Sequence, residues 1–206
     1  MARDPSPDLP LTPLQGKART IGQLLTTFHL LFVALDPFTH ESSWILPTAA
    51  RILQNFEQAD CRIAWLVTGT EDECRQFLGP WASRIMTFAD PERVAVKEFG
   101  LERLPALVHV GMHGAVVAEA EGWHPAEWRA VTDQLARTVS WEPPPTIPAP
   151  RDPGPFDGSP ATPTGTTSWG RATRWATGWW TKSSPGAGSR NWPVWSARVR
   201  QLRPDG

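Results

Sequence analysis

The sequence predicts an α/β domain with a central mixed β-sheet flanked by helices, and with disordered N- and C-terminal tails. Between residues 21 and 141, apolar runs of strand length alternate with segments whose apolar residues have helical spacing. Two short apolar stretches, 107–110 and 116–120, flank a glycine-containing turn and predict a hairpin. Strands alternating with helices, followed by a hairpin and a last helix, are typical of one mixed sheet with helices on both faces.

The first half of this domain contains two long apolar runs. Residues 28–35 are almost continuously apolar and stop at Asp36 and Pro37, which predicts a central strand buried on both faces. Residues 42–58 place apolar side chains at helical spacing. Residues 61–67 form a second apolar run, so a strand–helix–strand unit is expected here.

Local start and stop signals predict the remaining helices. Thr70 and Glu73 form a capping-box pattern that predicts a helix through about Leu78, within an extra helical segment of roughly 70–88. An Asp–Pro pair at its start and Gly100 at its end predict a helix over 91–99. Pro125 begins a last helix, which extends to about residue 139.

Composition separates this domain from its flanks. Residues 1–20 hold four prolines and few apolar side chains, which predicts a disordered leader. Residues 142–168 are rich in proline and predict an extended linker. Residues 169–206 combine six tryptophans with a net charge of +6, whereas the rest of the chain has −7, and we expect a disordered tail.

The basic, tryptophan-rich tail leaves three interpretations open. It is an inert disordered tail, a segment that contacts single-stranded nucleic acid or an anionic membrane surface, or the product of an altered reading frame. The abrupt rise of tryptophan, glycine and arginine after Pro163 motivates the last of these.

The cellular location and the redox state follow from what the sequence lacks. It contains no apolar stretch long enough for a transmembrane helix and no secretory signal, so a cytoplasmic location is expected. The two cysteines, Cys61 and Cys74, are 13 residues apart and match neither a Cys-x-x-Cys nor a zinc spacing. Two free thiols are therefore expected, and neither a metal nor a cofactor is predicted.

Several local features resemble the thioredoxin-like superfamily over about 115 residues. In that superfamily the first central strand ends in an aromatic residue followed by Cys-x-x-Cys, with a proline five residues after the second cysteine. Here Phe38 precedes Thr39 and Ser42, which occupy the two cysteine positions, and Pro47 follows. The Leu104–Pro105 segment resembles the family's cis-proline before the hairpin.

Two further details fit the same superfamily. Gly114 and Gly122 match its paired hairpin glycines. The extra segment at 70–88 resembles the peroxiredoxin and cytochrome-maturation branches. Residues 37–42 are similar to the peroxiredoxin loop Pro-x-x-x-Thr-x-x-Cys, with a shortened spacing.

The resemblance implies a site that has lost its redox chemistry. A thioredoxin depends on a thiolate that the helix N-terminus stabilises, and a hydroxyl neither ionises near neutral pH nor exchanges with disulfides. We expect Thr39 or Ser42 to cap the helix instead. Two alternatives are that the hydroxyls hold a thiol or an anion, and that Ser42 acts as a nucleophile with His40 as its base. The expected binding face consists of Phe38, Thr39, His40, Ser42, Leu104 and Pro105.

Other candidate residues lie outside this face. We expect Cys61 to be buried and Cys74 to be more exposed, with a regulatory disulfide between them as the alternative. His109 and His113 are four residues apart, which is weak evidence for a metal site, and the neighbours His40 and Glu41 are equally weak.

Three tryptophans of the domain have two possible roles. Trp44, Trp123 and Trp128 are expected to pack in the core or at its rim, and a surface cluster for a partner protein is the alternative.

The leading hypothesis is a non-catalytic binding module for a protein or a small thiol. The first alternative is a peroxiredoxin-like or thiol-disulfide oxidoreductase that uses Cys61 or Cys74. The second is an adaptor that binds nucleic acid or a membrane through residues 169–206.

Overall fold

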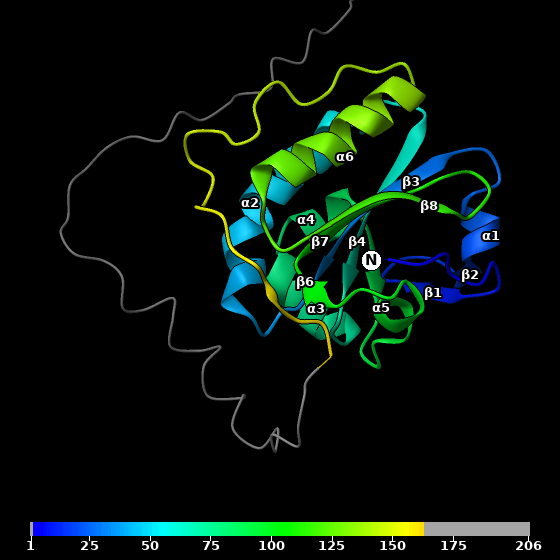
Figure 1. Cartoon of the computed structure of the whole chain (residues 1–206). Coiled ribbons are helices and arrows are strands. Elements are labelled where there is room, and N and C mark those ends of the chain that lie inside the picture. The colour runs from blue at the N-terminus through cyan, green and yellow to red at the C-terminus, as the bar shows by residue number, and fades with distance from the viewer. Residues whose placement is uncertain (1, 163–206) are drawn as a thin grey trace, which may run out of the picture. The chain divides into compact units, whose positions relative to one another are not determined.

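The computed structural model describes residues 2–162 (Figure 1), so the expected tail at 169–206 and the end of the linker lie outside the described residues. A seven-stranded sheet has the order β2-β1-β5-β4-β3-β7-β8. Its strands are β1 (Pro10–Pro13), β2 (Arg19–Thr20), β3 (His29–Leu35), β4 (Cys61–Val67), β5 (Met86–Ala89), β7 (Ala106–Val110) and β8 (Val116–Glu121). A separate pair joins β6 (Arg103–Leu104) to β9 (Ser159–Pro160).

The centre of the sheet is the predicted strand–helix–strand unit. Strand β3 pairs in parallel with β4, and β4 pairs in parallel with β5, while β7 runs antiparallel to β3 on its other side. Strand β3 is buried along almost its whole length, which confirms the burial that its continuous apolar run predicted. The hairpin of β7 and β8 is likewise present.

Helices cover both faces of the sheet (Figure 1). They are α1 (Ile21–Leu24), α2 (His40–Asn55), α3 (Glu71–Leu78), α4 (Trp81–Arg84), α5 (Val94–Glu98) and α6 (Pro125–Thr138). Side chains alternate along β3, so that Val33 packs with α2 and α6 on one face and Phe32 with α1 and α5 on the other. This arrangement confirms the expected α/β architecture.

Helix α3 begins as its sequence signal predicts. The Glu73 backbone N–H donates to Thr70 Oγ1 over 3.4 Å, and the Thr70 N–H donates to Glu73 Oε2 over 2.8 Å. The expectation that helical structure continues to about residue 88 is wrong, because Met86–Ala89 is strand β5 of the central sheet. A four-residue strand shows too little periodicity to be recognised, and its pairing with β4 and β1 determines its conformation.

The helix expected at 91–99 is shorter than predicted. Helix α5 begins at Val94, after Arg93 adopts a left-handed backbone conformation with φ 55°. Asp90 nevertheless caps this turn, because its carboxylate accepts hydrogen bonds from the Val94 N–H (2.7 Å) and the Val96 N–H (3.0 Å).

Residues 2–20 are part of the fold, so the expected disordered leader is wrong. Strand β1 pairs antiparallel with β5, and three leucines of this segment are buried. They are Leu9, Leu11 and Leu14. Two of the prolines that suggested disorder, Pro10 and Pro13, bound a strand of only four residues, whereas the leucines in and around this strand provide apolar surface that the fold covers.

The expected linker also packs on the domain as far as residue 162. Asp152 accepts hydrogen bonds from Thr48 Oγ1 (2.7 Å) and Arg51 Nη2 (2.8 Å), which ties the chain to α2. Residues 153–161, called the strap below, then cross to β6 and pair with it as β9. The domain therefore extends past its predicted end at residue 141. Among residues 2–162, no helix combines the length and the apolar character needed to cross a membrane.

Candidate functional site

The candidate site lies where β3 ends and α2 begins, at Asp36, Thr39 and Ser42. The Asp36 backbone N–H donates to Ser42 Oγ over 2.9 Å. Thr39 Oγ1 lies 3.1 Å from the Asp36 carbonyl oxygen and 3.0 Å from Ser42 Oγ. Each hydroxyl has one proton, so all groups are satisfied when Ser42 donates to Thr39 and Thr39 donates to the Asp36 carbonyl. The two hydroxyls form a closed ring with the Asp36 backbone.

The two hydroxyls form this ring instead of the expected helix cap, and the arrangement does not favour a catalytic role for either of them. Thr39 is the N-cap residue of α2, but its side chain makes no capping hydrogen bond to the first turn. Ser42 is fully buried, and none of its hydrogen bonds within residues 2–162 is to a histidine ring. A serine nucleophile needs a base within hydrogen-bond reach, so the arrangement does not support catalysis by Ser42.

A buried ion pair lies directly beneath the ring. Arg93 Nη2 contacts Asp36 Oδ2 at 2.7 Å, and both side chains are more than nine-tenths buried. The other carboxylate oxygen of Asp36 accepts from the Phe38 N–H over 3.0 Å. Arg93 Nη1 donates to the carbonyl of Ala161 in the strap over 2.5 Å. One guanidinium therefore connects the end of β3 with the C-terminal segment.

The Leu104–Pro105 segment comes directly before β7, the strand that pairs with β3, and it is covered. Its peptide bond is cis, and both residues are buried. Leu104 pairs with Ser159 of the strap, and Arg103 pairs with Pro160. Of the six residues of the expected binding face, Ser42, Leu104 and Pro105 are thus buried, whereas Phe38 and His40 are exposed.

The exposed part of the face is aromatic. Phe38 is 46% exposed and Trp44 is 56% exposed. The His40 ring stacks on Trp44 with centroids 6.1 Å apart, and Trp44 meets Phe156 of the strap edge-on at 6.0 Å. We call Phe38, His40, Trp44 and Phe156 the aromatic patch. Trp123 and Trp128 instead pack in the core, fully buried and edge-to-face at 5.1 Å, which confirms their predicted core role.

Both thiols are buried and far from ionisation at neutral pH. Burial, together with the charge of Asp60, raises the pKa of Cys61 to about 12. Burial and the charge of Glu73 raise the pKa of Cys74 to about 11. The expectation that Cys74 is exposed is wrong, because its side chain points from α3 into the core. At neutral pH only a very small fraction of either thiol is ionised to the thiolate, which is the form that acts as a nucleophile.

The structure pairs His109 with His29 rather than with His113. His109 Nε2 lies 3.0 Å from His29 Nδ1, across the neighbouring strands β7 and β3. His109 is fully buried and its Nδ1 has no hydrogen-bond partner. Burial, and the charge of His29, lower the pKa of His109 to about 4. Within residues 2–162, no group of three ligand-type side chains is arranged to hold a metal ion.

This histidine pair predicts a loss of stability in mild acid. Unfolded His109 has a pKa near 6.5 and folded His109 near 4, so unfolding takes up a proton between these values. The contribution of neutral His109 to the free energy of unfolding is complete above about pH 6.5 and is about 3 kcal/mol smaller at pH 4. We expect urea unfolding to show this loss in the wild type, and a loss smaller by that amount in His109→Leu. An equal pH dependence in both proteins would contradict the prediction.

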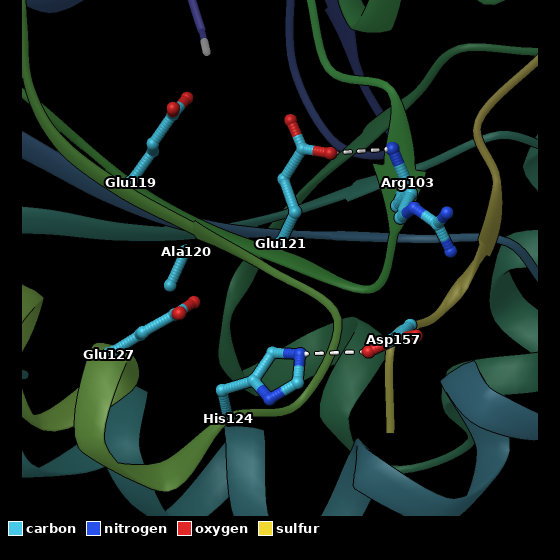
Figure 2. A pocket seen from close by; sticks show the side chains of 7 residues that line it. All are labelled: Arg103, Glu119, Ala120, Glu121, His124, Glu127 and Asp157. Carbon is cyan, nitrogen blue, oxygen red and sulfur yellow. Dashed lines mark hydrogen bonds and ion pairs between the residues drawn. The ribbon is translucent and has the colours of Figure 1, made fainter. Parts of the chain in front are cut away.

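An acidic cavity of about 390 Å³, which no sequence signal indicated, lies at the junction of β6, β8, α6 and the strap (Figure 2). Its lining residues are Arg103, Glu119, Ala120, Glu121, His124, Glu127 and Asp157. Glu121 accepts hydrogen bonds from the Arg103 N–H (2.7 Å), and His124 Nε2 lies 3.3 Å from Asp157 Oδ1. These residues are spread over four elements, so no local sequence pattern could reveal the cavity.

Comparisons with known proteins agree with this geometry at the level of the fold. No family model matches the chain, and no curated protein matches it either. A thiol:disulfide interchange protein DsbE from Chlorobium tepidum is 13% identical with a TM-score of 0.55, over 68% of this chain and 98% of its own. A cysteine-to-serine mutant of peroxiredoxin Q from Xanthomonas campestris is 16% identical with a TM-score of 0.55, over 65% and 93%.

A thioredoxin from Neisseria meningitidis is also similar, at 15% identity and a TM-score of 0.51, over 67% of this chain and 87% of its own. The chain therefore has the thioredoxin-like fold. At these identities the likeness concerns the fold alone, and the function has to be argued from the site.

Proposed function

We propose that this chain is a non-catalytic thioredoxin-fold module that binds a protein through its aromatic patch. The observation that carries the proposal is the hydroxyl ring of Thr39 and Ser42, the two residues that the resemblance places at the positions of the redox thiols. A site without sulfur at these positions cannot form the mixed disulfide on which exchange depends. Phe38 and Trp44 provide exposed aromatic surface beside the ring, and such residues are enriched where proteins bind one another.

The site favours a protein over a small thiol as the ligand. Ser42 is fully buried, the strap pairs with Leu104, and Pro105 is buried, so the ring and the proline offer a thiol no open surface. The two unpaired thiols, Cys61 and Cys74, are typical of a reducing compartment, which supports a cytoplasmic location as part of the proposal.

Insulin reduction by dithiothreitol tests the absence of redox turnover. The full chain is expected to leave the rate of insulin precipitation within twofold of the uncatalysed rate, because neither hydroxyl can attack a disulfide. A working thioredoxin serves as the positive control. Clear acceleration by the wild type would contradict the proposal.

The second candidate is an oxidoreductase that uses Cys61 or Cys74. It is favoured by the structural similarity to a thiol:disulfide interchange protein and a peroxiredoxin. The burial and the raised pKa values of both thiols count against it, because either thiol would need a local opening of the fold to react. Disulfide or peroxide reduction that disappears in Cys61→Ser or Cys74→Ser would identify this function.

A further inference from the structure

Trp44 is the most exposed large apolar side chain among the described residues, yet its indole is held on two sides. The His40 ring, one helical turn earlier on α2, stacks on it with an interplanar angle of 19°. Phe156 of the strap meets it at an interplanar angle of 71°, with centroids 6.0 Å apart. Phe156 is fixed in turn, because its backbone exchanges hydrogen bonds of 2.7 and 3.0 Å with Trp123. The exposed indole therefore has a defined orientation.

The rings of Trp44 and Phe156 form an aromatic corner, a name that we use below for the space between them. The face of an aromatic ring carries negative partial charge and its edge carries positive partial charge. Because these two rings meet almost at a right angle, a cation placed between them lies close to both. Aromatic cages of this kind are the usual sites for ammonium groups that carry alkyl substituents.

The charges next to the aromatic patch suit a cationic ligand. The residues that adjoin the four patch residues in the sequence include two carboxylates, Glu41 and Asp157, and neither lysine nor arginine. Asp157 contacts His124 but remains 77% exposed. Residues 2–162 as a whole have a net charge of −7, which attracts cations over a longer range.

No cation of the described chain fills the corner. Within residues 2–162, the cation–π contact is that of Arg62 with Phe28, whose ring centroid lies 5.1 Å from the guanidinium carbon. Trp44 and Phe156 have no such contact with any lysine or arginine of these residues. The corner is thus oriented for a cation that another molecule has to supply.

We propose that the aromatic corner binds an alkylammonium group of the partner protein, the side chain of lysine or of N-methylated lysine. The inference rests on the proposed function and names the chemistry of the partner residue. The two rings contact the alkyl groups of this side chain and attract its charge. The rest of the aromatic patch contacts apolar residues beside it, as is usual at the centre of a protein interface.

The experiment uses the full chain and three peptides of the form acetyl-Gly-Gly-X-Gly-Gly-amide. Position X is lysine, trimethyl-lysine, or the neutral isostere of trimethyl-lysine in which carbon replaces the quaternary nitrogen. NMR follows the indole N–H signal of Trp44, which is assigned by its loss in Trp44→Leu. The trimethyl-lysine peptide is expected to bind with a millimolar Kd and about threefold or more tightly than the isostere, because the two differ only in charge.

The lysine peptide distinguishes the two forms of the ligand. We expect it also to bind more tightly than the neutral isostere. Whichever cationic peptide binds more tightly shows whether the unmodified or the methylated side chain is the better ligand.

Phe156→Leu tests the geometry of the corner, since it removes one ring and keeps an apolar side chain. The variant is expected to bind the trimethyl-lysine peptide no more tightly than the isostere. Trp141→Leu is the matched control, because Trp141 is also exposed, at 38%, but lies outside the aromatic patch. This control is expected to bind all three peptides like the wild type.

The comparison of peptides on the wild type needs no variant, so it decides the inference even if Phe156→Leu does not fold. Equal binding of the isostere and the trimethyl-lysine peptide, or no shift of the Trp44 signal with either cationic peptide at millimolar concentrations, would overturn the inference. Either result leaves the patch available to bind a partner through apolar contacts alone. Acceleration in the insulin assay would instead overturn the proposed function.

Discussion

Replacing Arg93 with alanine is expected to lower the free energy of unfolding by about 3–5 kcal/mol at pH 7, as measured by urea denaturation. The variant leaves the Asp36 carboxylate buried without its cation. It also removes the donor to the Ala161 carbonyl, so the end of β3 and the strap lose their shared contact. An uncompensated buried charge is among the most destabilising changes in a folded protein.

Arg75→Ala is the matched control. Arg75 forms ion pairs with Glu71 and Asp72 on the surface of α3, where all three side chains are substantially exposed. It also donates to the Leu14 carbonyl over 3.2 Å, a hydrogen bond that contributes about 1 kcal/mol. Surface pairs of this kind contribute less than about 1 kcal/mol. A comparable loss in both variants would show that burial of the Asp36–Arg93 pair has no special importance.

Leu11→Ala is expected to lower the free energy of unfolding by about 2–5 kcal/mol, since it leaves a cavity beneath β1. Leu11 is 4% exposed and belongs to the same apolar cluster as Ile21, Leu24 and Phe88. Urea unfolding at pH 7 measures this effect. It directly tests whether the N-terminal segment is a structural strand.

The control for this prediction comes from the same strand. Thr12 is exposed and pairs with Ala89 through its backbone, so Thr12→Ala is expected to change stability by less than about 0.5 kcal/mol. If Leu11→Ala were as mild as Thr12→Ala, the N-terminal residues would behave as the disordered leader that their composition suggests.

The long elements were predictable because their burial is encoded in consecutive residues. The apolar run at 61–67 coincides with β4, and the last helix begins at Pro125 as predicted. Both β1 and β5 were missed, because a strand of four residues carries no clear period. Their conformation depends on backbone hydrogen bonds to each other, and β5 in addition on those to β4.

The candidate site, like the fold, was predictable from the sequence only in part. The spacing of Thr39 and Ser42, with Pro105 before the hairpin, was visible in the sequence and predicted hydroxyls in place of thiols, which stays a prediction. That these hydroxyls form a ring with the Asp36 backbone, above a guanidinium from 57 residues away, was not visible. Long-range contacts of this kind leave no local pattern.

The sequence by itself therefore determined the thioredoxin-like architecture and the absence of sulfur where α2 begins, since both depend on residue type and on regular spacing along the chain. Only the tertiary structure decided which part of the expected binding face is accessible. It buried Cys74 and Pro105, paired Leu104 with the strap and left Phe38 and Trp44 exposed. The physical reason is that accessibility depends on how segments distant in the sequence pack together, and here the residues after 141 fold back onto the domain.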